Sequence, residues 1–159
     1  IKMDYKITTY SEEETIELAQ NIESEKFPNM VICLEGDLGT GKTVFTKGFA
    51  KAMEIDEEVT SPTFNIIKEY TSGEMPLYHM DVYRLDGKMN GLDIEEYYTK
   101  KGVTIIEWAD MIPDLLPDKR LDIKFRSSSE DEDKRIITLI PHGKKYEEVC
   151  EAVVWEFFI

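Results

Sequence analysis

The sequence predicts a three-layer α/β fold, in which helices cover both faces of a mainly parallel sheet. Two continuous apolar runs, at residues 30–34 and 103–106, are typical of strands buried on both faces. Segments with apolar residues at helical spacing alternate with such runs along the chain. Two alternating segments, at residues 121–126 and 135–140, flank an acidic turn at 127–133. They predict an antiparallel hairpin at the edge of the sheet.

The other expected elements follow from local signals. Ser11 and Glu14 form a capping-box pattern, which predicts a helix that begins at Ser11. We expect three more helices, over residues 43–53, 92–101 and 144–155. We expect three more strands, over residues 5–9, 63–70 and 77–82. No repeat or linker divides the chain, so residues 1–159 are expected to form one domain.

The composition argues against several classes of function. The chain has 33 acidic and 19 basic residues, and its net charge of −14 opposes a broad contact with DNA or RNA phosphates. The same charge could complement a basic patch on a protein partner. No apolar stretch approaches the roughly 20 residues that a membrane span requires, so we expect a cytoplasmic protein. Cys33 and Cys150 lie far apart among apolar neighbours, which favours buried thiols over a metal or redox motif.

Residues 36–43, GDLGTGKT, match the phosphate-binding pattern G-x-x-x-x-G-K-[ST] at every specified position. A buried strand is expected directly before this loop and a helix directly after it, which is the context that the pattern requires. Glycines let the backbone turn its N–H groups toward anionic oxygens, and the helix N-terminus adds partial positive charge. Lys42 is expected to reach the outer phosphates and the Thr43 hydroxyl to bind Mg²⁺. The sequence therefore predicts a P-loop NTPase-like domain that binds a nucleoside triphosphate.

Hydrolysis of the nucleotide also needs carboxylates near the metal. Glu107 follows the apolar run at 103–106, and Asp81 follows the segment 77–80. Side chains at the carboxyl ends of strands face the ligand crevice of an open α/β sheet. We assign Glu107 to the metal, directly or through water, and Asp81 to a second metal-side or water-orienting role. His79 could polarise a group near the phosphates, but a lone histidine in an apolar run is more often a core histidine, and we favour that interpretation.

Four segments together resemble the TsaE (YjeE) family of ATPases: GDLGTGKT at 36–43, TSPTF at 60–64, HMDVYRL at 79–85 and IEWAD at 106–110. The resemblance implies ATP and Mg²⁺ as ligands. It implies Thr43 and Glu107 as metal ligands and Asp81 as a support for hydrolysis. The phosphates would be held by the loop residues Asp37, Leu38, Gly39, Thr40, Gly41 and Lys42. Further nucleotide contacts would come from Thr60 and Thr63 in a switch-like loop, from Trp108, and from Ser11 near the base.

The same resemblance implies a role in forming threonylcarbamoyladenosine, the modified base beside the anticodon of tRNA. The partner would be a complex of the TsaD–TsaB type, with tRNA involved only indirectly. Two alternatives are a nucleotide-gated binding module, in which ATP orders residues 60–64 for docking, and a small-molecule kinase. The chain has no arginine-rich lid segment, which argues against the kinase, and no Asn-Lys-x-Asp motif, which argues against a GTPase.

Overall fold

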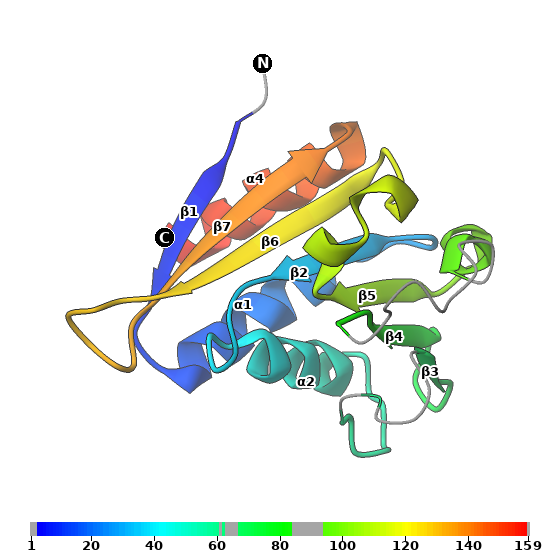
Figure 1. The fold of residues 1–159 in the computed structure, drawn as a ribbon, viewed down its shortest axis with the longest axis horizontal. Coiled ribbons are helices and arrows are strands. Elements are labelled where there is room, and N and C mark those ends of the chain that lie inside the picture. Colours follow the sequence, from blue (N-terminus) through cyan, green and yellow to red (C-terminus); the bar gives the residue numbers. More distant parts are fainter. Residues whose placement is uncertain (1–2, 61, 63–66, 84–93, 159) are drawn as a thin grey trace.

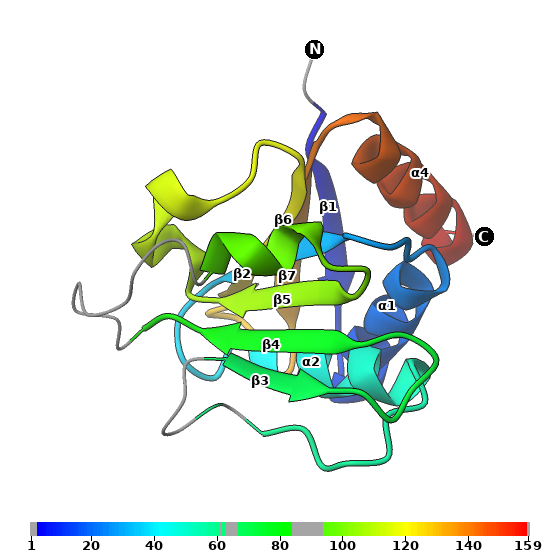
Figure 2. The same ribbon diagram turned by 90° about the vertical axis from the view of Figure 1, so that its right-hand side faces the viewer.

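The computed structural model describes residues 3–60, 62, 67–83 and 94–158, which form a sheet with helices packed against it (Figures 1 and 2). Within these residues the sheet has seven strands in the order β1-β7-β6-β2-β5-β4-β3. These strands are β1 (Tyr5–Thr9), β2 (Val31–Glu35), β3 (Ile67–Tyr70), β4 (Leu77–Asp81), β5 (Val103–Glu107), β6 (Arg120–Ser127) and β7 (Arg135–His142). Each predicted strand is therefore present, although residues 63–66 lie outside the described part of the chain.

Parallel pairing is confined to the centre of the sheet. There β2 pairs with both β5 and β6, and β5 pairs with β4. The pairings β1–β7, β6–β7 and β3–β4 are antiparallel, so the sheet is mixed rather than mainly parallel. The predicted hairpin β6–β7 also lies inside the sheet, because β1 pairs along β7 and takes the edge. Alternation along a strand reports which of its faces is buried and not how many neighbours it has, so the sequence pattern did not distinguish these positions.

Three α-helices lie together on one face of the sheet: α1 (Glu12–Ser24), α2 (Lys42–Ala52) and α4 (Lys144–Phe158) (Figure 2). The opposite face is covered, within the described residues, by short 3₁₀ helices instead of a full helical layer. They are η1 (Glu96–Thr99), η2 (Ala109–Met111) and η3 (Pro113–Leu115). The described part of the helix predicted over residues 92–101 thus ends in a 3₁₀ turn.

The first helix begins as the capping pattern predicts. Ser11 is the N-cap residue of α1, and its hydroxyl accepts a hydrogen bond from the N–H of Glu14 at 3.1 Å. The Glu14 carboxylate accepts from the N–H of Tyr10, also at 3.1 Å, one residue earlier than the standard capping box has it.

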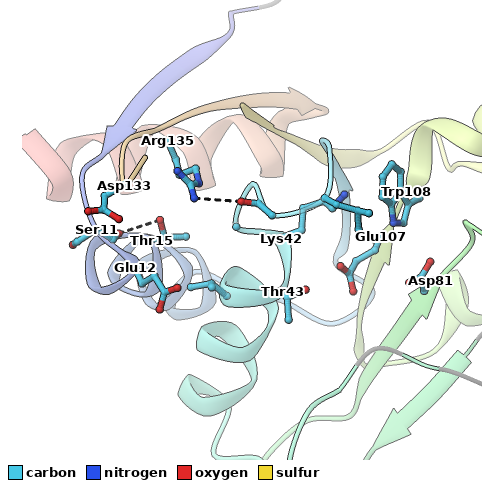
Figure 3. A pocket seen from close by; sticks show the side chains of 14 residues that line it. Ser11, Glu12, Thr15, Lys42, Thr43, Asp81, Glu107, Trp108, Asp133 and Arg135 are labelled. Atoms are coloured by element: carbon cyan, nitrogen blue, oxygen red, sulfur yellow. Dashed lines mark hydrogen bonds between the residues drawn. The ribbon is translucent and has the colours of Figure 1, made fainter. Parts of the chain in front are cut away.

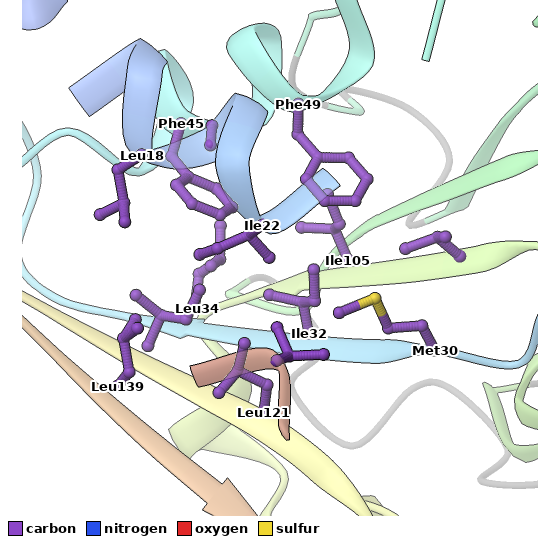
Figure 4. Close-up of a cluster of buried hydrophobic side chains, with 14 of the residues drawn as sticks. Leu18, Ile22, Met30, Ile32, Leu34, Phe45, Phe49, Ile105, Leu121 and Leu139 are labelled. Carbon is purple, nitrogen blue, oxygen red and sulfur yellow. The ribbon is translucent and has the colours of Figure 1, made fainter. Parts of the chain in front are cut away.

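The larger core lies between the sheet and the three α-helices (Figure 4). Ile32 and Leu34 of β2 and Phe45 and Phe49 of α2 are fully buried in it. Burying one side chain of this size contributes about 1.5–3 kcal/mol to stability. The core therefore fixes β2 relative to α2, and with them the loop that joins the two.

Candidate functional site

The loop of residues 36–41 joins the buried central strand β2 to the N-terminus of α2. Gly36, Gly39 and Gly41 have φ angles of +150°, +77° and +109°. Side chains disfavour these conformations, and a Cβ on Gly36 would also lie 2.6 Å from the carbonyl oxygen of Phe125. The glycines of the pattern are thus required by the backbone that the fold imposes here.

Lys42, the first residue of α2, is folded back against its own loop. Its side chain is buried, and its ammonium donates a hydrogen bond to the carbonyl oxygen of Gly36. The Lys42 Nζ atom also lies 3.5 Å from the centre of the Trp108 ring, a cation–π contact. Burial lowers the pKa of Lys42, and the nearby charge of Glu107 is the strongest of those that oppose this shift. Thr43, the next residue, is exposed.

Two carboxylates meet at the carboxyl ends of neighbouring strands, as predicted. Asp81 of β4 and Glu107 of β5 are paired in register across these parallel strands. Glu107 is buried, whereas Asp81 is half-buried and accepts a hydrogen bond from the N–H of Tyr83 at 3.0 Å. Burial raises the pKa of Asp81, and the charge of Glu107 adds to this shift. The pair therefore forms an acidic end of the site next to Lys42.

His79 is buried, as expected of a core histidine, yet it also contacts the site. Its Nε2 atom lies 2.5 Å from Oε2 of Glu107. Trp108 follows Glu107 in the left-handed region, at φ +62°, and its ring centre lies 4.7 Å from that of Tyr83.

A pocket of about 270 Å³ runs from these acids across the loop to the N-terminus of α1 (Figure 3). Its far end is lined by Ser11, Glu12 and Thr15 of the α1 region and by Asp133 and Arg135 of the β6–β7 hairpin. The guanidinium of Arg135 donates a hydrogen bond to the carbonyl oxygen of Gly39 at 3.2 Å. Sequence reasoning missed these hairpin residues. Arg135 follows Lys134 after an acidic turn, and nothing in this local sequence signals that it meets a loop 96 residues earlier.

Most of the predicted site residues line this one pocket. They are Ser11, Leu38, Gly39, Gly41, Lys42, Thr43, Asp81, Glu107 and Trp108. Asp37 and Thr40 belong to the loop but do not line the pocket, and the buried Thr40 hydroxyl donates to the carbonyl oxygen of Asp37 at 2.6 Å. Thr60 lies elsewhere, where its N–H donates to the Tyr70 hydroxyl at 3.3 Å. Thr63 lies outside the described residues.

The described residues contain no group of three or more His, Cys, Asp or Glu side chains placed to hold a metal ion. Thr43 and Glu107 both line the pocket and could supply two oxygen ligands. This fits Mg²⁺, because that ion is usually held by one or two protein oxygens together with substrate phosphates and water.

A glycine loop of this backbone geometry, set between a buried strand and a helix N-terminus, is how P-loop proteins bind the phosphates of nucleotides. By fold and site, the chain is a protein of that class.

Comparison with known proteins narrows the class to one family. The model of the family described as "Threonylcarbamoyl adenosine biosynthesis protein TsaE" matches residues 9–137, and the chain belongs to the TsaE family. It is 47% identical over 145 residues to the tRNA threonylcarbamoyladenosine biosynthesis protein TsaE of Bacillus subtilis, covering 91% of this chain and 90% of that one. The protein of the same name from Aquifex aeolicus is 36% identical over 131 residues, covering 81% and 90%.

A solved structure has the same fold. The crystal structure of Bacillus subtilis YdiB superposes with a TM-score of 0.82 at 42% identity, over 98% of this chain and 97% of that one. The mixed α/β fold is therefore shared with a solved structure over nearly its full length. In the part of the chain that the structure describes, no helix has both the length and the apolar character to cross a membrane.

Proposed function

We propose that the chain binds Mg-ATP and hydrolyses it slowly in the biosynthesis of threonylcarbamoyladenosine in tRNA. The observation that carries this proposal is the meeting of Lys42, Thr43, Asp81 and Glu107 in one pocket. The backbone N–H groups of the loop and the N-terminus of α2 would bind the phosphates. Mg²⁺ would neutralise negative charge on the phosphate oxygens, and Thr43 and Glu107 would hold it.

Each of the remaining side chains then has a role in phosphoryl transfer. The Lys42 ammonium would leave the Gly36 carbonyl and the Trp108 ring to bind the outer phosphate oxygens. Asp81, whose raised pKa favours uptake of a proton, would orient the attacking water and accept a hydrogen bond from it. The nucleoside would extend toward Ser11 and Arg135, because the acids occupy the opposite end of the pocket.

We propose a complex of the TsaD–TsaB type as the partner, and a cytoplasmic location. The relatives named above carry the name of this tRNA modification. The net charge of −14 suits docking on a basic protein surface and does not favour a direct grip on tRNA.

The test is ATP turnover by the chain alone and with a TsaD–TsaB preparation, followed as release of phosphate. We expect slow turnover alone, faster turnover with the partner, and loss of turnover and of tRNA modification in Glu107→Gln with nucleotide binding retained. Modification that persists in Glu107→Gln would favour the gating module, and phosphate found on a metabolite would favour a kinase. No nucleotide binding by the native chain would overturn the proposal.

A further inference from the structure

His79 is a buried polar side chain whose one polar contact among the described residues is with Glu107. The side chain is 2% exposed, and its Nε2 atom lies 2.5 Å from Oε2 of Glu107, itself 3% exposed. With its proton on Nε2, the ring donates a hydrogen bond to this carboxylate. The other ring nitrogen, Nδ1, has no hydrogen-bond partner within the described residues.

Packing alone does not explain a histidine at this position. His79 shares a face of the sheet with Leu77 of β4 and Ile105 of β5, both of which are fully buried in the apolar core. An apolar residue would fill the same space without burying an unpaired ring nitrogen, and an unpaired polar group in the interior costs stability. The contact with Glu107 is what this histidine adds.

The contact decides which partner Glu107 has. Of the charges near the Lys42 ammonium, that of Glu107 has the strongest effect on the pKa of Lys42. Among the described residues, however, Lys42 and Glu107 form no ion pair. With Oε2 held by His79, the second carboxylate oxygen is left for a cation or its bound water. Without His79, the Glu107 carboxylate would be free to rotate, and neither of its oxygens would be held toward the metal.

We propose that His79 is a positioning residue, which holds the Glu107 carboxylate on the metal side of the pocket. This inference rests on the proposed function, because it assigns His79 to the magnesium requirement of nucleotide binding. It predicts that loss of His79 weakens the contribution of magnesium and leaves the magnesium-independent contacts of the nucleotide unchanged.

The test is a calorimetric titration with a non-hydrolysable ATP analogue, in EDTA and at increasing Mg²⁺. In His79→Leu we expect the Kd of the analogue in EDTA to stay within about twofold of the native value. The Mg²⁺ concentration that gives half of the maximal gain in affinity should rise about tenfold, as is typical when a residue that orients a metal ligand is lost. Melting followed by circular dichroism checks that each variant is folded.

Two amide variants of His79 test the same proposal if His79→Leu folds poorly. The amide of His79→Gln can reach the position of Nε2 and donate to Glu107, whereas the shorter His79→Asn reaches only the position of Nδ1. Glutamine should therefore restore most of the native magnesium dependence and asparagine should not. His142→Leu is the matched control, because it removes a similar contact, 2.7 Å from His142 Nε2 to Asp122 Oδ2, away from the pocket.

A native magnesium dependence in both His79→Leu and His79→Asn would overturn the positioning role alone, as would an equal shift in His142→Leu. Absence of nucleotide binding by the native chain would overturn the proposed function as well. In a Glu107→Gln background, His79→Leu should add less than about a twofold change, because the two residues act as one unit.

Discussion

At the scale of the residue, the site holds charged side chains in surroundings that disfavour their charge. Burial lowers the pKa of Lys42 and raises the pKa of Asp81. Both shifts mean that the charged forms lose hydration that the ligand-free protein does not fully replace. A phosphate for the cation and a water or cation for the carboxylate would relieve this cost. Perturbed groups of this kind are typical of functional sites.

Replacing Asp81 by Asn should stabilise the ligand-free protein at pH 7. Since folding raises the pKa of Asp81, the native state resists its ionisation, and stability falls as the pH rises from the unfolded-state pKa through the folded one. Asparagine removes this loss and keeps an oxygen for the N–H of Tyr83. The measurement is urea unfolding at several pH values: the gain should be present at pH 7 and shrink toward pH 4.

Asp110→Asn is the control, because it makes the same change of charge at an exposed position nearby and should shift stability by less than about 0.5 kcal/mol. An Asp81→Asn variant that is less stable than native at pH 7 would contradict this account of Asp81.

At the scale of the element, the site depends on how closely α1 approaches α2. Both helices contribute to the pocket, α1 through Glu12 and Thr15 and α2 through Lys42 and Thr43. Gly48 of α2 lies at their contact, where an added Cβ would be 3.2 Å from Cα of Ile16. The absence of a side chain at this position therefore sets the spacing between the two helices.

Gly48→Val should lower the free energy of unfolding by about 1–3 kcal/mol, the usual cost of overpacking. Its branches would press on the backbone of α1 at Ile16 and on Ala19, where even a Cβ would lie 3.4 Å from the Ala19 Cβ. Chemical denaturation measures the change. Lys47→Val places the same side chain at the exposed neighbouring position and should cost less than about 0.7 kcal/mol, the range of helix propensity. Equal losses in the two variants would show that packing against α1 is not the cause.

At the scale of the whole molecule, the sheet separates two apolar cores, each of which contains one cysteine. Cys150 of α4 lies in the larger core, and Cys33 of β2 lies in the smaller core on the opposite face. Both thiols are free and buried, as the sequence predicts. Burial raises the pKa of Cys150 to about 12 and raises that of Cys33 as well.

Neither thiol should therefore react with a disulfide reagent such as DTNB while the protein is folded at pH 8, because the thiolate is the reactive form. In moderate urea both should react at one common rate, if the two cores unfold together, and Mg-ATP should slow that rate. Cys33→Ser and Cys150→Ser assign the two signals. Rapid labelling of one thiol in the native protein would show that its core opens independently.

Much of the molecule follows from local sequence. The phosphate loop could be identified because its residues are contiguous and its glycines serve the backbone of a single turn. The strands and α-helices were located because periodicity records which side chains are buried. Asp81 and Glu107 were found for a related reason, since the last residues of parallel neighbouring strands share one edge of the sheet.

The contacts between distant segments could not be predicted from the sequence and are known from the fold. Three features depend on which strands become neighbours. They are the pairing of β1 with β7, the hydrogen bond from Arg135 to the carbonyl oxygen of Gly39, and the contact of His79 with Glu107. The hydrophobic periodicity of a segment indicates which of its side chains are buried, but not which residues they contact. The sequence alone therefore predicts the phosphate loop and the two acids beside it, because these depend on contiguous residues and strand ends. The fold adds the contact that orients Glu107 and the residues that line the far end of the pocket, because both depend on segments far apart in the chain.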